Sequence, residues 1–195
     1  MNDVVNLPIG LTLARIVLVP FVVMFLISSS RVHVIIAAVI FVAASLTDWL
    51  DGLIARRRNQ VTTLGKLLDP VADKLLVIAA LVALVQIETV PAWMVFVIVG
   101  REFAVTGLRA ISASVGVIVP ASQLGKYKTM SQYVAITLLI LEKGVSVEYV
   151  PFYWLSYVAL WVALVLTVVS GIDYFIRFFR KADYHALVRD QDRWP

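Results

Sequence analysis

The sequence of 195 residues contains no cysteine and only two histidines. The absence of cysteine excludes disulfides, thiolate metal sites and cysteine nucleophiles. Charged residues make up only 15% of the chain, whereas a soluble domain typically has about 25%. Each charge that interrupts an apolar run therefore needs an explanation. The formal charge of +4 is ordinary for a protein with basic loops and does not indicate a nucleic-acid partner.

Apolar side chains are in excess, at 61% of the residues, and the mean hydropathy is +0.91. A soluble domain is about 45–50% apolar, so this composition indicates a membrane protein. We predict one all-α domain over residues 1–195, an integral membrane bundle of six transmembrane helices with a short polar tail at about 181–195. The six apolar segments approach or exceed the ~20 residues that cross a bilayer, except that the fifth is short: Ile9–Ser28, Val32–Ala55, Pro70–Ile87, Ala92–Val115, Tyr127–Leu141 and Phe152–Phe179.

Basic residues gather in alternate connections, which predicts an orientation. Three arginines, Arg56 to Arg58, lie between the second and third segments, and Lys126 and Lys128 lie between the fourth and fifth. The positive-inside rule then places these loops and both termini in the cytoplasm of a multi-pass cell-membrane protein. The first segment contains Arg15 and is too long for a signal peptide, so we expect it to be a retained span.

Four aspartates lie close together in the sequence beside these oily segments. Asp48 and Asp51 are three residues apart, and Asp69 and Asp73 are four apart, so each pair shares one face of a helix. A short basic connection joins the two helices, which predicts that both pairs lie near the cytoplasmic boundary. Pro70 leaves two possibilities: it opens the third helix, or it lies within a helix that begins near Thr63.

Four ionised carboxylates at membrane depth require protonation, basic partners or bound cations. Protonation would suit a proton pathway, and the nearby cations Arg56 and Lys74 number only two. Two divalent ions would balance the charge, and an all-oxygen ligand set favours Mg²⁺ or Mn²⁺ over zinc. Paired ions of this kind clamp phosphoryl groups during displacement. A divalent-cation or proton transporter with intramembrane carboxylates is the remote alternative.

The small residues beside the acids fit a ligand site. Gly52, Ala55 and Gly65 would let a ligand approach the helix backbone, and Arg56 offers a fork suited to phosphate. Close helix packing and membrane topology are the alternative explanations for these residues.

The pattern Asp48-x2-Asp51-Gly52-x2-Ala55-Arg56-x8-Gly65-x3-Asp69-x3-Asp73 resembles the signature of the CDP-alcohol phosphotransferase family. The resemblance implies a six-helix membrane enzyme, a homodimer with a cytoplasmic active site, that transfers a substituted phosphate from a CDP-linked donor to an alcohol and releases CMP. It implies two Mg²⁺ or Mn²⁺ ions held by Asp48, Asp51, Asp69 and Asp73, with Asp73 also the general base. The donor contacts that it implies are Asp48, Asp51, Gly52, Ala55, Arg56, Thr62 and Gly65.

Three further segments resemble one branch of that family, the phosphatidylglycerophosphate synthases: Asn6–Arg15, Arg101–Arg109 and Pro120–Thr129. This implies CDP-diacylglycerol and glycerol 3-phosphate as substrates, with Asn6 and Thr12 on the donor side; Ile9 departs from the pattern of some relatives. Other acceptors, namely inositol phosphate, serine or a phospholipid, are the nearer alternative.

Four basic residues form a candidate site for the acceptor phosphate: Arg101, Arg109, Lys126 and Lys128. Arg101 and Arg109 are eight apart and lie on one side of a helix, and the lysines approach from the same predicted side. Alternatively, these residues anchor the protein at the interface and contact anionic lipids, with Arg101 paired to its neighbour Glu102.

Overall fold

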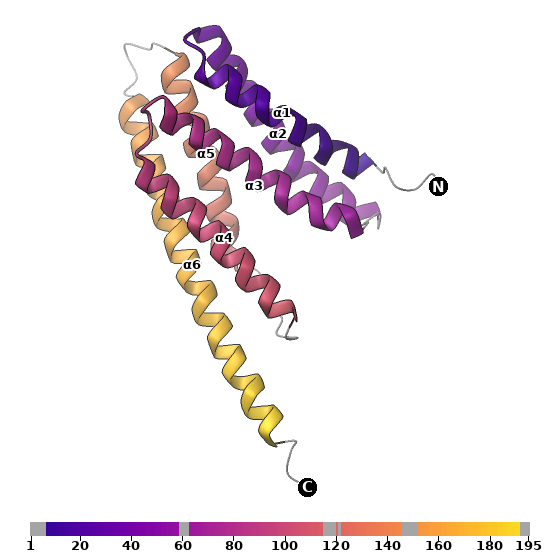
Figure 1. Ribbon diagram of the computed structural model, residues 1–195. Coiled ribbons are helices and arrows are strands. Elements are labelled where there is room, and N and C mark those ends of the chain that lie inside the picture. Colours follow the sequence, from indigo (N-terminus) through magenta and orange to yellow (C-terminus); the bar gives the residue numbers. More distant parts are fainter. Residues whose placement is uncertain (1–6, 59–62, 115–119, 121, 146–151, 192–195) are drawn as a thin grey trace.

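Figure 1 shows a computed structural model of the protein, which describes residues 7–58, 63–114, 120, 122–145 and 152–191. Within the helices, side chains are not described at 7–9, 11, 48–58, 63–70, 73, 152 and 182–191. The six helices are α1 (Leu7–Ile27), α2 (Arg31–Arg58), α3 (Thr63–Gln86), α4 (Ala92–Ser114), α5 (Gln123–Gly144) and α6 (Phe152–Gln191). The described ranges contain no strand, which confirms the prediction of an all-α fold with six helices.

Successive helices run in opposite directions along one bundle (Figure 1). Helix α1 packs against α2 and α3, and α5 packs against α2 and α6, so that α5 joins the two sides of the bundle. Helix α4 packs mainly on α6 and also contacts α3. The end of α2, the start of α3 and the start of α1 lie at the same end of the molecule (Figure 1). The α2–α3 connection therefore brings the two aspartate-bearing segments to this end.

Apolar side chains from all six helices form one core. Phe41 of α2, Leu81 of α3 and Ile140 of α5 are fully buried in it, together with Val22 and Leu26 of α1. Each helix contributes one apolar stripe to the interior, because residues three and four apart lie on the same face. This packing holds the six helices, and the polar side chains between them, in one arrangement.

Many large apolar side chains lie on the outside of the bundle. Phe96 is 78% exposed, Trp154 65% and Val17 60%. Among the described residues, Tyr153–Lys181 is the one helical segment that is long and apolar enough to cross a membrane, with 29 residues and a stretch of 18 whose mean hydropathy is 2.2. The apolar parts of three other helices are shorter. The six transmembrane spans and their orientation therefore stay predictions.

Three helix boundaries differ from the sequence-based expectation by four residues or more. Helix α3 begins at Thr63 and continues through Pro70, so the second of the two possibilities for this proline is correct. Helix α5 begins at Gln123, four residues before the apolar run, because the Ser122 hydroxyl caps it and accepts a hydrogen bond from the Gly125 amide at 3.3 Å. Helix α6 extends to Gln191, so most of the expected polar tail is helical.

Candidate active site

The four aspartates lie on two consecutive helices close to the turn that joins them. Asp48 and Asp51 fall in the last part of α2, and Asp69 and Asp73 fall in the first part of α3. Their helical spacing is as expected from the sequence. Their side chains lie outside the described part of the structure, and so do those of Gly52, Ala55, Arg56 and Gly65, which share these helices. Asn6 and Thr62 lie wholly outside the described residues. The proposed roles of all ten residues stay predictions.

The chemistry of this donor set fits hard divalent cations, because aspartate supplies oxygen ligands alone. Among the side chains that the structure describes, no group of three or more histidines and acidic residues gathers elsewhere in the molecule. The metal site expected at the end of α2 and the start of α3 stays a prediction.

Helix α1 places two polar side chains inside the bundle at the same end. Thr12 is 2% exposed and Arg15 is 3% exposed, although both belong to an otherwise apolar helix. Because α1 packs against both α2 and α3, these two residues lie next to the helices that carry the aspartates. Their burial agrees with a position beside a polar site, and the donor-side role of Thr12 stays a prediction.

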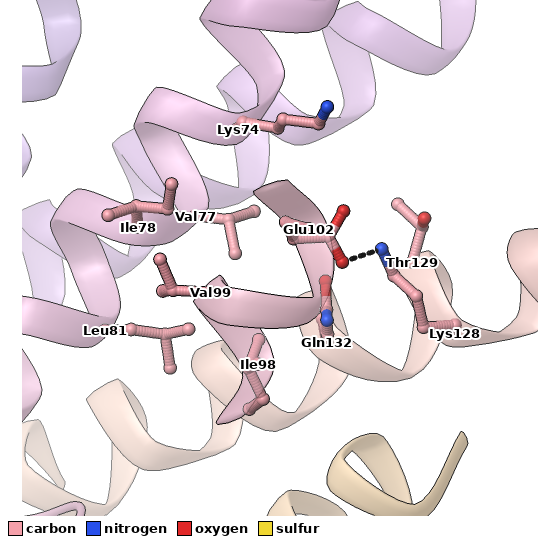
Figure 2. Close-up of a pocket in the computed structure, with 10 residues that line it drawn as sticks. All are labelled: Lys74, Val77, Ile78, Leu81, Ile98, Val99, Glu102, Lys128, Thr129 and Gln132. Carbon is pink, nitrogen blue, oxygen red and sulfur yellow. Dashed lines mark hydrogen bonds and ion pairs between the residues drawn. The ribbon is translucent and has the colours of Figure 1, made fainter. Parts of the chain in front are cut away.

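The structure brings together two of the four basic residues assigned to the acceptor. Arg101 of α4 and Lys128 of α5 both bind the same carboxylate oxygen, Oε1 of Glu102. The Arg101 Nη1 atom lies 3.3 Å from this oxygen, and the Lys128 ammonium forms the second ion pair (Figure 2). Arg101 also donates a hydrogen bond from Nη2 to the Ser170 hydroxyl of α6 at 2.9 Å. One carboxylate thus links α4 with α5, and one guanidinium links α4 with α6.

The other two basic residues lie on the surface. Arg109 and Lys126 are exposed, and the Arg109 guanidinium lies 5.6 Å from the centre of the Tyr174 ring. This distance is that of a cation–π contact. The four basic residues therefore divide into an inner pair, the half-buried Arg101 and the buried Lys128, and an exposed pair.

Figure 2 shows the small cavity beside Lys128, which Lys74, Glu102, Lys128, Thr129 and Gln132 line together with apolar side chains. Its volume of about 20 Å³ is enough for one water molecule. A phosphate group does not fit into this cavity, so the acceptor would have to approach the cations from another side.

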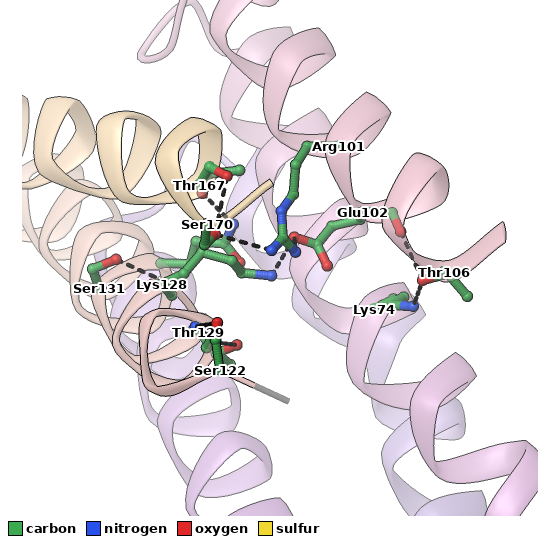
Figure 3. A network of polar contacts seen from close by, with 12 residues as sticks. Lys74, Arg101, Glu102, Thr106, Ser122, Lys128, Thr129, Ser131, Thr167 and Ser170 are labelled. Carbon is green, nitrogen blue, oxygen red and sulfur yellow. Dashed lines mark hydrogen bonds and ion pairs between the residues drawn. The ribbon is translucent and has the colours of Figure 1, made fainter. Parts of the chain in front are cut away.

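A contact between α3 and α4 connects the aspartate segment with the basic cluster. Lys74, the residue after Asp73, donates a hydrogen bond to the Thr106 hydroxyl (Figure 3). Thr106 in turn donates to the backbone carbonyl of Glu102 at 2.7 Å. The two halves of the candidate site are thus joined by hydrogen bonds as well as by the apolar core.

Glu102 is the residue of this cluster that the sequence analysis did not place in the site. It was considered only as a partner of its neighbour Arg101, whereas it also binds Lys128, which is 26 residues away. A carboxylate inside an apolar segment is costly without partners. The position of Glu102 within an apolar run is therefore the signal in the sequence that indicates a role for it.

Residues 5–169 match the CDP-alcohol phosphatidyltransferase family. The chain is 48% identical to the CDP-diacylglycerol--glycerol-3-phosphate 3-phosphatidyltransferase of Bacillus subtilis (strain 168), over 87% of this chain and 93% of the relative. It is 42% and 41% identical to the proteins of the same name from Rickettsia bellii and Rickettsia typhi, over 87% of this chain and 93% and 95% of those relatives. The chain therefore belongs to the CDP-alcohol phosphatidyltransferase family and is a transferase of that class.

Proposed function

We propose that the protein transfers the phosphatidyl group from CDP-diacylglycerol to sn-glycerol 3-phosphate, and releases phosphatidylglycerophosphate and CMP. The observation that carries this proposal is the similarity to relatives named for this reaction, which extends over 87% of the chain. Similarity of that extent reaches far beyond the aspartate signature that the whole family is expected to share. It therefore supports the acceptor as well as the class of reaction.

The α2–α3 turn is the proposed binding site of the donor. Two divalent cations, Mg²⁺ or Mn²⁺, held by Asp48, Asp51, Asp69 and Asp73 would neutralise the charge of the donor pyrophosphate. Gly52, Ala55, Arg56, Thr62 and Gly65 would contact the nucleotide and pyrophosphate, with Asn6 and Thr12 nearby.

Asp73 is the proposed general base. Its carboxylate takes the proton of a glycerol hydroxyl, whose oxygen attacks the phosphorus that bears diacylglycerol. The new P–O bond forms as the bond to the CMP oxygen breaks, and CMP leaves. Such displacements depend mainly on the positioning of the two substrates and on charge stabilisation. The adjacent Lys74 donates a hydrogen bond to Thr106, so this turn of α3 is held against α4, the helix that carries Arg101 and Arg109.

The acceptor phosphate is proposed to bind at the basic residues of α4 and α5. The exposed Arg109 and Lys126 would attract the dianion, and the half-buried Arg101 and buried Lys128 would fix it. Charge-assisted hydrogen bonds of this kind are stronger than neutral ones. Inositol or serine, which carry no phosphate, would have less need of four cations.

We also propose that the six helices span the cell membrane with both termini and the active site at the cytoplasmic side, and that the protein is a homodimer. The large apolar side chains on the outside of the bundle support a lipid environment, because a soluble monomer rarely exposes a continuous apolar surface of this kind. The basic connections support the orientation.

The experiment is an assay of purified protein with CDP-diacylglycerol, Mg²⁺ and one acceptor at a time. Glycerol 3-phosphate should give CMP and phosphatidylglycerophosphate in equal amounts, whereas serine and inositol phosphate should give far less. CMP release with another acceptor alone would change the assigned acceptor. No CMP release with any acceptor or divalent metal would contradict the proposed reaction.

A further inference from the structure

Glu102 holds two cations close together that would otherwise repel each other. Arg101 Nη1 and Lys128 Nζ both bind its Oε1 atom, and they come from different helices. Two like charges bonded to one oxygen atom lie only a few ångströms apart, where their repulsion is large in a protein interior. The shared carboxylate is what makes this arrangement stable, so the relative position of the two cations depends on Glu102.

The burial of Glu102 and Lys128 makes the position of Lys128 depend more strongly on the charge of Glu102. Glu102 is 9% exposed and Lys128 is 5% exposed, so neither charge is screened well by water. Removing one partner of a buried ion pair leaves the other charge poorly compensated, and the side chain then moves to find water or another partner. We expect Lys128 to change its position if the Glu102 charge is lost.

Helix α6 fixes the other side of the cluster. The Ser170 hydroxyl accepts a hydrogen bond from Arg101 at 2.9 Å (Figure 3). The Arg101 side chain also passes close to Gly171. A Cβ atom on Gly171 would lie only 3.0 Å from the Arg101 Cγ atom. The absence of a side chain at Gly171 thus lets Arg101 reach Ser170 while it also binds Glu102.

The cations retain the capacity to bind a further anion in this arrangement. An ammonium group has three N–H donors and a guanidinium has five. The donor that each cation gives to Glu102, and the one that Arg101 gives to Ser170, are only part of that set. The carboxylate can therefore orient both groups without excluding a phosphate from them.

We propose that Glu102 is a positioning residue that holds Arg101 and Lys128 as one cationic pair for the acceptor phosphate. This inference rests on the proposed function, since it assumes that the acceptor carries a phosphate. Glu102 itself touches neither substrate in this account. Ser170 and Gly171 support it by holding Arg101 in contact with the carboxylate.

The test compares Glu102→Gln with wild type in the CMP-release assay, with each substrate varied in turn. The glutamine keeps the shape of the side chain but removes the charge. We expect the KM for glycerol 3-phosphate to rise at least about tenfold, while the KM for CDP-diacylglycerol changes less than about twofold. Glu102→Asp, which keeps the charge, should recover part of the loss.

Two further variants separate positioning from folding. Ser170→Ala removes only one hydroxyl from the cluster, and we expect it to raise the same KM by about two- to fivefold. Glu142→Gln is the matched control, because Glu142 is a partly buried carboxylate that accepts a hydrogen bond from Ser156. It lies 14 residues after Lys128 on α5, about 21 Å along the helix at 1.5 Å per residue. It should leave both KM values unchanged.

The KM values of Glu102→Gln support or overturn the inference. An unchanged or lower KM for glycerol 3-phosphate in Glu102→Gln would overturn the inference, and so would an equal rise for both substrates. If Glu102→Gln does not fold, as judged by thermal unfolding in detergent, Ser170→Ala and Glu102→Asp decide by the same criterion. If the wild-type protein does not use glycerol 3-phosphate, the proposed function fails before the variants are compared.

Discussion

The ammonium group of Lys74 donates a hydrogen bond to the hydroxyl of Thr106, and this contact joins α3 to α4 (Figure 3). Lys74 directly follows Asp73, and Thr106 is bonded to the backbone of Glu102. The helix that carries two of the aspartates is therefore tied to the helix that carries Arg101 and Arg109, two of the four residues proposed to bind the acceptor. Transfer between two substrates requires such a fixed spacing, because a small misplacement of the reacting groups lowers the rate strongly.

This tie predicts the effect of Thr106→Val. The change removes the hydroxyl and keeps the size of the side chain, so we expect kcat to fall about two- to fivefold, as for the loss of one exposed hydrogen bond. Thr137→Val is the control, because the Thr137 hydroxyl likewise donates to the backbone carbonyl four residues earlier, at 2.8 Å, at a distance from the site. Equal effects of the two variants on kcat would show that the hydroxyl acts only within its own helix.

The assignment of the general base predicts that Asp73→Asn loses turnover but keeps nucleotide binding. Loss of a general base typically costs about 10²–10⁴-fold in rate, whereas binding of CDP would still be supported by the other aspartates. Turnover is measured as CMP release and binding by calorimetry with CDP. The control is Asp173→Asn, since Asp173 pairs with Arg177 on α6 at 2.8 Å. Normal turnover by Asp73→Asn would exclude the base assignment.

The metal assignment predicts that activity depends on a divalent cation. Chelation with EDTA should abolish CMP release, and addition of Mg²⁺ or Mn²⁺ should restore it, because four carboxylates alone would repel the pyrophosphate. CDP binding should weaken in parallel. Full activity in EDTA after extensive dialysis would contradict a metal-dependent site.

The exposed basic residues predict a selective effect on the acceptor. Arg109→Ala and Lys126→Ala should each raise the KM for glycerol 3-phosphate by about tenfold, since each removes a charge-assisted contact to a phosphate. The KM for CDP-diacylglycerol should remain the same. Lys143→Ala, at the far end of α5, is the matched control and should change neither value. A general loss of affinity for the membrane would instead affect both substrates.

The close approach of Arg101 to α6 predicts different outcomes for two glycines. Gly171→Ala would place a Cβ 3.0 Å from the Arg101 Cγ atom, whereas a Cβ at Gly100 meets no atom within 4 Å. Alanine favours a helix by about 1 kcal/mol over glycine, so neither variant should lower the unfolding temperature greatly. Gly171→Ala should nevertheless raise the KM for glycerol 3-phosphate, and Gly100→Ala should not. An equal KM for glycerol 3-phosphate in Gly171→Ala and Gly100→Ala would show that the close approach to Gly171 does not hold Arg101 in place.

The helices were predictable from the sequence because their apolar runs are long. The ends of α4, Ala92–Ser114, agree with the expected segment to within one residue, since Pro91 directly precedes it and Gly116 follows two residues after its end. The ends of α5 were less predictable, because Lys126, Lys128 and Glu142 interrupt its apolar run although the helix continues through them. The hydropathy of a segment indicates whether it is expected in an apolar or an aqueous environment. The ends of a helix depend instead on capping residues such as Ser122.

The class of chemistry was also predictable, since it depends on local spacing. The family match over residues 5–169 confirms what the aspartate pattern indicated. Two acids at a spacing of three or four residues share a helix face wherever that helix lies in the fold. Such a spacing can be recognised in the sequence without knowledge of tertiary contacts.

The amino-acid sequence by itself determined six helices, the family and the reaction class, because helix periodicity and residue spacing are local properties. Tertiary structure alone decided which charges meet. Glu102 binds Lys128 across 26 residues, and Arg101 reaches Ser170 across 69. Those contacts depend on how α4, α5 and α6 pack, and on the close approach that Gly171 allows. A charged residue that the sequence assigns to substrate binding can therefore also form an ion pair or hydrogen bond within the fold.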